Sequence, residues 1–358
     1  MILFYLILVF FMFVFGGVSA FAQDATPIPT AEPGSAVQVA VLPAAYTLGG
    51  INFEYQGWNN CGPATLTNAL SFYGYTENQT RAANWLKPNR EDKNVSPWQM
   101  VQFVNSQVPE LPVYALQRAG GTLNTLKMLI SNNFPVIIEA GYDPEPDRLG
   151  WMGHYLLVSG YDDAAGVIIT QDSYLGPNHQ YSYAHIQEFW QHFNYTYIVV
   201  YESGREPELL SLLGEDADEQ QNAINALELA TAEATADRDN AFAWFNMGTN
   251  FVKLNVMDRA AIAYDESRRI GIPWRMLWYQ FGPFEAYQAI GRYNDVIELA
   301  RNNQNDGGGH YVEETFYYAA LAREALGETD RAINNLREVI TFNPNFTPAR
   351  EKLDTLTQ

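Results

Sequence analysis

Residues 58–64 have the sequence Trp-Asn-Asn-Cys-Gly-Pro-Ala, and they contain Cys61, the single cysteine of the 358-residue chain. Pro63 suits the first turn of a helix, and apolar residues at helical spacing follow it as far as Gly74. The pattern therefore predicts Cys61 at a helix N-terminus, where unpaired N–H groups and the helix dipole stabilise a thiolate. A buried structural cysteine is the alternative, but a junction between loop and helix favours a nucleophile.

The sequence around this stretch predicts an α+β domain over residues 46–203. Ser96, followed by a proline, and Thr122 each begin a further helical pattern. Strand-like apolar runs come after these helices, at 135–139, 154–161, 166–171 and 195–201. Helices followed by consecutive strands are typical of the α+β class.

Three polar residues are candidates for work with the thiol. His154 begins an apolar strand and is the candidate general base. Asp172 follows the next strand, so a hairpin of the two strands would bring its carboxylate to the imidazole and orient it. Gln56 lies five residues before Cys61, where its amide and the Cys61 N–H can donate to an oxyanion. Taken singly, the three have ordinary alternatives: an edge-strand histidine, a turn aspartate and a surface glutamine.

Together these residues resemble the C39-like cysteine peptidase family, which has a papain-like fold. The motifs of that family correspond here to Gln56, Asn59–Ala64, Gly153–Tyr155, Gly160–Asp162 and Asp172. One position departs from the pattern, because Ser173 stands where proline is usual. This departure weakens the assignment of Asp172 and leaves Cys61 and His154 unaffected.

The resemblance implies cleavage of an amide bond by the thiol. Cys61 would attack the carbonyl carbon, and His154 would accept the thiol proton and return it to the leaving amine. Asp172 would hold His154, and Gln56 would bind the oxyanion together with the Cys61 N–H. The sequence contains no cofactor motif and no metal-ligand spacing, so neither a cofactor nor a metal is expected.

Residues 216–358 are predicted to be helical throughout, and they contain an internal repeat. Similar turns begin at Leu254, Ile290 and Leu326, an offset of 36 residues both times, and an aromatic-rich helix precedes each turn. The pattern resembles the tetratricopeptide repeat, which implies an all-α superhelix with a concave face for a protein or peptide partner. The alternative is that the aromatic residues only pack between the helices.

Residues 1–22 have the pattern of a secretory signal peptide, because a long apolar run ends in Ala20-Phe21-Ala22. No Lys or Arg precedes the run, so an uncleaved N-terminal membrane anchor is the alternative. Residues 23–45 are rich in Pro, Ala and Thr, which predicts a flexible linker. We therefore expect a secreted or extracytoplasmic protein, held at the membrane if the first segment is retained.

The formal net charge of −20 argues against nucleic acid and anionic membrane surfaces as partners. We expect an exported cysteine peptidase with a Cys-His-Asp triad, whose helical repeats recruit a protein substrate or partner. An amidase that cuts peptidoglycan peptides is one alternative, and a non-enzymatic adaptor that uses the peptidase fold as a binding module is another. An aspartate in the orienting position favours the peptidase over the amidase, and the intact set of four residues argues against the adaptor.

Overall fold

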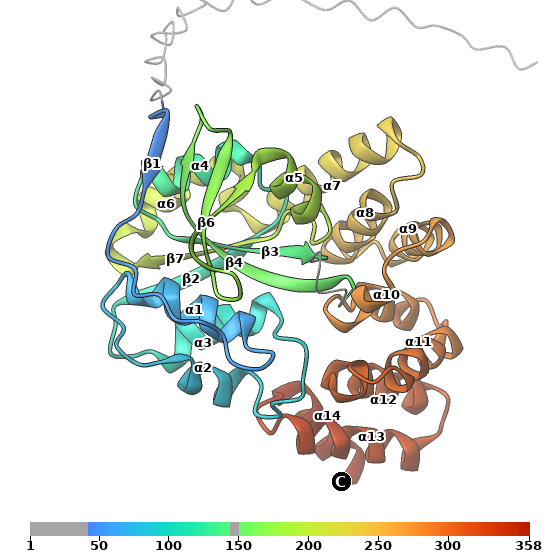
Figure 1. Cartoon of the computed structure of the whole chain (residues 1–358). Coiled ribbons are helices and arrows are strands. Elements are labelled where there is room, and N and C mark those ends of the chain that lie inside the picture. Colours follow the sequence, from blue (N-terminus) through green and yellow to red (C-terminus); the bar gives the residue numbers. More distant parts are fainter. Residues whose placement is uncertain (1–41, 144–149) are drawn as a thin grey trace, which may run out of the picture. The chain divides into compact units, whose positions relative to one another are not determined.

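The computed structural model describes residues 42–143 and 150–358. Residues 42–358 form one compact unit, whose strands and helices are shown in Figure 1. The predicted signal peptide or anchor (1–22) and most of the predicted linker (23–45) lie outside the described residues. Within the described ranges, no helix combines the length and the apolar character needed to cross a bilayer.

The first part of this unit is built on an antiparallel sheet. Its strands are β1 (Ala45–Thr47), β2 (Val113–Arg118), β3 (Val136–Tyr142), β4 (Met152–Asp162), β5 (Val167–Asp172), β6 (Gly176–Ser182) and β7 (Tyr197–Glu202). The order across the sheet is β2-β7-β3-β4-β5-β6, and β1 pairs with β4. β4 and β5 form the hairpin that the sequence predicts, with Leu157 opposite Gln171.

Helices cover both faces of this sheet (Figure 1). One face carries α1 (Cys61–Ser71), α2 (Gln79–Leu86) and α3 (Pro97–Gln107), and the other carries α4 (Leu123–Ser131), α5 (Tyr183–Gln191) and α6 (Glu206–Leu213). Val136 and Ile138 of β3 pack into the core with α4, whereas Ile137 packs into the core with α1 and α3. Because successive strand residues point to opposite faces, two covered faces make β3 an almost continuous apolar strand.

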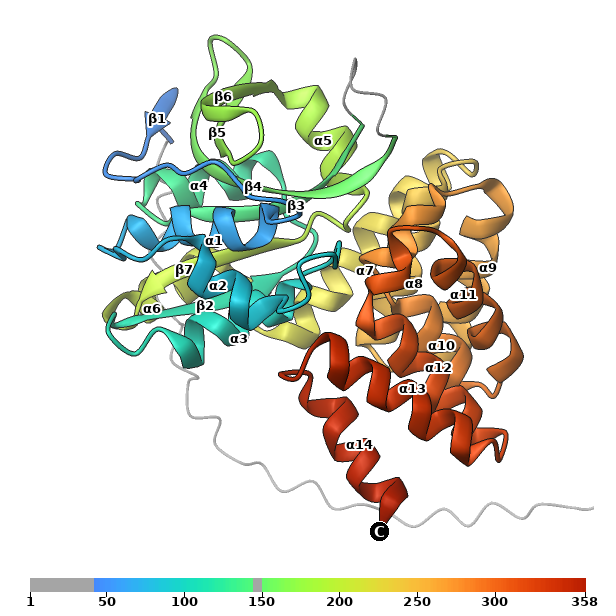
Figure 2. The same ribbon diagram turned by 60° about the horizontal axis from the view of Figure 1, so that its bottom comes forward.

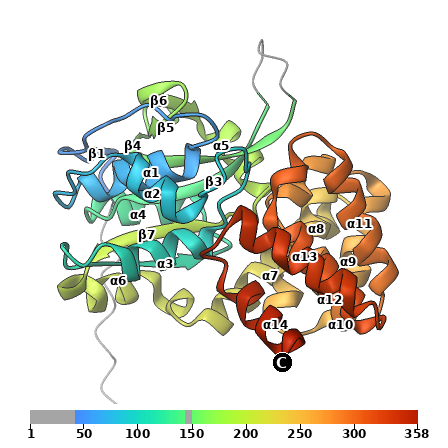
Figure 3. The same cartoon turned by 90° about the horizontal axis from the view of Figure 1, so that it is seen from below.

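The second part is helical. It contains α7 (Glu219–Ala236), α8 (Ala241–Lys253), α9 (Met257–Ile270), α10 (Gly282–Ala289), α11 (Tyr293–Asn305), α12 (Glu313–Ala325), α13 (Thr329–Phe342) and α14 (Thr347–Thr357). Short 3-10 helices connect some of these elements: η1 (Ser203–Arg205), η2 (Gly214–Ala217), η3 (Trp274–Trp278) and η4 (Gly309–Tyr311). Figures 2 and 3 show α7–α14 gathered on one side of the sheet.

The repeat found in the sequence has a common backbone form at its turns. Asn255, Gly291 and Gly327 lie 36 residues apart, and their φ values of 57°, 79° and 78° fall in the left-handed region. At each turn the following N–H donates over 2.8 Å to the carbonyl five residues earlier. This is the Schellman ending, which satisfies carbonyls that a helix terminus leaves unpaired and favours Gly or Asn at the left-handed position. The helical part is therefore consistent with three copies of one unit.

Close packing between repeat helices depends on two glycines around Tyr264, a fully buried side chain of α9. A Cβ atom at Gly248 of α8 would lie 2.6 Å from the Tyr264 ring, and one at Gly282 of α10 would lie 1.9 Å from its hydroxyl. Neither distance is compatible with a side chain. The phenol ring thus occupies space that only glycine leaves on both neighbouring helices.

Polar contacts join the helical part to the sheet part. Asn222 of α7 accepts from the Ala119 N–H (3.0 Å) and donates to the Ala119 carbonyl (2.9 Å). The buried amides of Asn194 and Asn250 donate to each other over 2.8 and 3.1 Å. The Arg118 guanidinium donates to the Asp216 carbonyl (2.6 Å) at the connection between the parts.

The predicted fold class is confirmed: an α+β part is followed by an all-α part. The predicted domain boundaries, 46–203 and 216–358, stay predictions, because residues 42–358 behave as a single compact unit.

Candidate active site

Cys61 is the first residue of α1, as the position of Pro63 predicts. The N-cap residue is Asn60, but its side chain does not cap the helix; its amide donates to Gln79 instead (3.1 Å). Asn59 has a left-handed backbone (φ 55°), which turns the loop into the helix. Pro63 has no N–H, and the Ala64 N–H donates to the Asn60 carbonyl (2.9 Å), so the N–H groups of Cys61 and Gly62 are those of the first turn that can act at the thiol.

The structure brings His154 to Cys61. His154 lies near the start of β4 and is buried, and its imidazole is near enough to the thiol to act on its ionisation. Burial raises the pKa of the Cys61 thiol, but the interaction with His154 and the backbone groups of Tyr155 and Gly62 together lower it more, so the pKa falls below its ordinary value. Burial lowers the pKa of the His154 imidazole, but the charge and hydrogen bonds of its partners raise it to about 10. These opposite directions are those of a thiolate–imidazolium pair.

Asp172 ends β5 and lies at the same end of the hairpin as His154. Its Oδ1 is 2.9 Å from His154 Nε2, which leaves the other ring nitrogen, Nδ1, for the thiol. Tyr181 donates to Asp172 Oδ2 (2.6 Å), and the N–H groups of Tyr174 and Leu175 donate to Oδ1 (2.8 and 3.1 Å). Burial raises the pKa of the Asp172 carboxyl, but the charge of His154 and these hydrogen bonds hold it well below its usual range.

Gln56 is hydrogen-bonded to Ser173, the residue after Asp172. Its N–H donates to the Ser173 carbonyl (2.8 Å), and its side-chain Oε1 accepts from Ser173 Oγ (2.9 Å). Because Oε1 is bonded, the amide nitrogen Nε2 is the end of the side chain that can donate to a substrate. Ser173, the position that departs from the family pattern, therefore contributes a hydroxyl where a proline has none.

A small pocket lies directly beside the thiol. Its lining residues include Cys61, Gly62, Val95, Glu139 and Tyr155, together with Tyr279 from the end of η3. Gly153, which precedes His154, also lines it, and a Cβ atom there would lie 2.9 Å from Phe193 and 3.0 Å from Tyr279. The glycine of the Gly-His-Tyr motif thus makes room for two rings, one of which comes from the helical part.

The remaining histidines lie elsewhere. His192 is stacked on Phe242 with ring centroids 3.6 Å apart, and burial lowers its pKa to about 4. His179 and His185 flank Tyr181, and His310 lies in η4. In the part of the chain that the structure describes, no three His, Cys, Asp or Glu side chains gather closely enough to hold a metal ion.

The comparisons with known proteins concern the part that carries these residues. Residues 49–198 match a protein-family model described as the Peptidase_C39 like family. This part of the chain is a C39-like peptidase region. The predicted resemblance to the C39-like family is thereby confirmed, and Gln56, Cys61, His154 and Asp172 all lie within the matched residues.

Two solved structures are similar to the chain at low identity. A putative C39-like peptidase from Bacillus anthracis is 14% identical, with 44% of this chain and 97% of that chain covered and a TM-score of 0.36. The MamA RS-1 ArsTM double mutant is 12% identical, with 42% and 82% covered and a TM-score of 0.35. No curated protein matches the chain.

Sequence reasoning missed several residues around the C39-like site. Tyr181 was hidden because β6 is a largely exposed, polar edge strand with no apolar alternation. Glu139 was visible only as the end of an apolar run, although a carboxylate in a buried strand is a signal that a pocket is near. Tyr279 carried no signal, because its position follows from the packing of the helices against the sheet.

Proposed function

We propose that the chain is an exported thiol-dependent peptidase that hydrolyses peptide bonds with Cys61, His154 and Asp172. One observation carries the proposal. The thiol of Cys61 lies at a helix N-terminus beside the imidazole of His154, and that imidazole is bonded to the buried carboxylate of Asp172. A thiolate is the nucleophilic form of cysteine, and this arrangement supplies both its base and the group that orients the base.

The proposed first step forms a bond between Cys61 Sγ and the carbonyl carbon of the substrate. The oxyanion accepts hydrogen bonds from the Cys61 N–H and from Gln56 Nε2. His154, protonated in the pair, gives its proton to the leaving amine as the C–N bond breaks, which leaves an acyl-enzyme. His154 then takes a proton from water, and the resulting hydroxide attacks the thioester carbon. The C–S bond breaks, the carboxylic acid product leaves, and the Cys61 thiolate and the protonated His154 are restored as a pair.

Asp172 positions His154 throughout this cycle. Its Oδ1 holds Nε2, so the ring presents Nδ1 to the thiol and to the leaving group. Its negative charge stabilises the imidazolium form, in line with the raised pKa of His154. The hydroxyl of Tyr181 and two backbone N–H groups keep the carboxylate ionised and fixed although it is buried.

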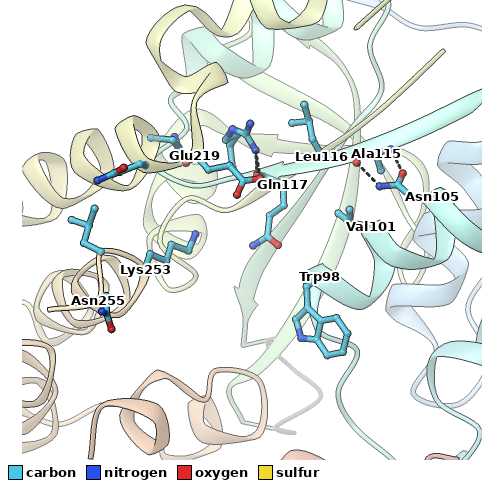
Figure 4. Close-up of a pocket in the computed structure, with 13 residues that line it drawn as sticks. Trp98, Val101, Asn105, Ala115, Leu116, Gln117, Glu219, Lys253 and Asn255 are labelled. Carbon is cyan, nitrogen blue, oxygen red and sulfur yellow. Dashed lines mark hydrogen bonds and ion pairs between the residues drawn. The ribbon is translucent and has the colours of Figure 1, made fainter. Parts of the chain in front are cut away.

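We further propose that the helical part recruits the protein substrate or partner. A pocket of about 700 Å³ lies between the edge strand β2 and the start of α7 and end of α8 (Figure 4). Gln117 from β2, Glu219 from α7 and Lys253 from α8 line it, and Trp98 stands at its border. Such a surface offers backbone and charged groups to an extended chain. We also propose that the protein is exported. Residues 1–22 are then either removed as a signal peptide or retained as a membrane anchor.

An electrophilic probe for activated cysteines tests the function. We expect it to label the full chain at neutral pH, and to label neither the Cys61→Ala variant nor chain pretreated with peroxide. Reductant should restore labelling unless oxidation has passed the sulfenic acid. A peptide library then identifies the cleaved bond. Absence of labelling and of cleavage would contradict the proposal, and release of stem peptides from peptidoglycan without cleavage of the library would indicate the amidase.

A further inference from the structure

A second cavity lies next to the pocket at Cys61, between the sheet and the helical part. Its volume is about 340 Å³, within the range of cavities that bind small ligands. Glu139 and Tyr279 line both this cavity and the thiol pocket. On its other side it adjoins the pocket of Figure 4, because Trp98, Gln117 and Lys253 line both. The three spaces therefore form a series that leads to the thiol.

Three carboxyl groups line this cavity, which we call the acid cavity: Glu139 of β3, Glu285 of α10 and Glu314 of α12. Glu285 accepts from the Tyr318 hydroxyl (2.7 Å). Glu314 Oε1 accepts from Asn94 Nδ2 (3.0 Å) and Ser96 Oγ (3.2 Å). Its Oε2 has no hydrogen-bond partner, although Glu314 is only 4% exposed. A buried carboxylate oxygen without a donor is costly, so a positive charge beside the Glu314 carboxyl would stabilise it.

The charges around the acid cavity are mostly negative. Two further buried acids, Asp92 and Glu313, act on Glu314 or on each other. The buried ammonium group of Lys87 acts on Asp92 and Glu313, and Lys253 lines the cavity. Burial, followed by the charge of neighbouring Glu313, raises the pKa of Glu314, and burial raises the pKa of Glu285. A cation placed among these carboxyls would restore their ionised forms and would be attracted by them.

Aromatic rings complete the lining. Trp98, Phe281, Tyr317, Tyr318 and Phe346 all face this space. Rings around carboxylates attract organic cations, because an ammonium or guanidinium group interacts with the ring faces while its stem packs against them. The described side chains offer no set that could hold a metal ion, so an organic cation fits the cavity better than a metal.

We propose that the acid cavity binds the Lys or Arg side chain of the peptide substrate, close to the bond that Cys61 attacks. The inference rests on the proposed function, since it assigns a specificity site to that reaction. The carboxyl groups of Glu314 and Glu285 pair with the basic group, and Glu139 and Tyr279, which line both spaces, lie between this site and the thiol pocket. The helical part thereby supplies part of the substrate site.

Binding to the Cys61→Ala variant of the full chain tests this inference without turnover. The probes are two blocked peptides that differ only in one residue, Lys or its neutral isostere norleucine, with the sequence around that residue taken from a randomised library. Calorimetry should give a preference for the Lys peptide of about tenfold or more. Glu314→Gln should reduce this preference to about twofold or less, whereas Glu338→Gln, an exposed residue of α13, should leave it unchanged.

Glu285→Gln provides a second variant if Glu314→Gln unfolds, and thermal melting checks both. Equal binding of the Lys and norleucine peptides, or a Lys preference that survives both variants, would overturn the inference. The two proposals fail separately. A Lys preference in a chain that never reacts with the cysteine probe removes the peptidase and keeps the cavity, whereas cleavage with no preference for Lys or Arg keeps the peptidase and removes the cavity.

Discussion

The C39-like region and the helical part differ in how their sequences specify structure. In the C39-like region, short motifs carry individual side chains to one place, so that Cys61 and His154 meet although they are 93 positions apart in the chain. In the helical part, repeated small and aromatic residues define helices and turns, and no single residue stands out. Yet Tyr279 and Glu314 of the helical part lie at the pockets beside the thiol. The comparison shows that a regular scaffold can contribute to a site without any motif of its own.

Replacing the proposed base should have the largest effect, and it separates the two regions directly. We expect His154→Ala to lower kcat/KM about 1000-fold or more, because the thiol loses its proton acceptor. The pKa of Cys61 should rise to its ordinary value or above it, since burial raises it and His154 is the main group that lowers it. Alkylation by iodoacetamide as a function of pH measures this shift. His310→Ala, which changes an exposed histidine of η4 in the helical part, is the matched control and should change neither quantity.

Loss of the proposed oxyanion donor should be the next largest effect. Gln56→Ala should reduce kcat about 100-fold with little change in KM, because the amide acts on charge that develops in the transition state. Ser173→Ala should cause a smaller reduction, about three- to tenfold, since it frees Gln56 Oε1 without removing Nε2. Gln180→Ala, an exposed residue of β6, is the control. A Ser173→Ala variant with unchanged kcat would show that Gln56 needs no positioning.

The most diagnostic effect of Asp172→Asn should be a shift in the pH dependence of the rate, rather than a loss of the maximal rate. The acid limb of the wild-type profile reports the lowered pKa of Cys61, and the alkaline limb reports His154, near pH 10. Asp172 raises the pKa of His154, so its neutralisation should move the alkaline limb to lower pH and reduce the rate at neutral pH about tenfold or more. The exposed-site control is Asp354→Asn in α14. An alkaline limb that stays in place would contradict the role given to Asp172.

The smallest effect should come from the helical side of the thiol pocket. Tyr279→Ala should speed alkylation of Cys61 about two- to fivefold, because the ring lines the pocket through which a reagent arrives. Trp274→Ala removes an exposed ring from η3, the short helix that precedes Tyr279, and should leave the rate unchanged. If both variants behave alike, the helical part does not restrict access to the thiol. The C39-like region would then supply the thiol pocket without a measurable contribution from the helical part.

The sequence predicted the parts of the fold that have a strong local signal. The structure contains the helix at Cys61, the N-cap Ser96, the helix that starts near Thr122, the β4–β5 hairpin and the 36-residue repeat. β6 escaped prediction because it is polar, and α2 because it is short and mostly polar. Such elements are held by tertiary packing, which overrides weak local preference.

The residues of the candidate site likewise fall into those with a local sequence signal and those without one. Cys61, His154 and Asp172 were predictable as a group, because each follows a recognisable helix or strand boundary and the hairpin brings two of them together. The bond from Ser173 to Gln56 was not predictable, since a serine in place of a proline gives no hint of its partner. Glu314 meets Asn94 across 220 positions of the chain, and no local pattern specifies a contact of that range.

The paired amides of Asn194 and Asn250 have a consequence for how relatives of this chain should vary. Each side chain donates to the other while both are buried, so a change at one position leaves the other amide unsatisfied. We therefore expect the two positions to be exchanged together or not at all. In any set of homologous sequences, joint substitution of this pair should mark the lineages in which the packing of α8 against the sheet part has changed.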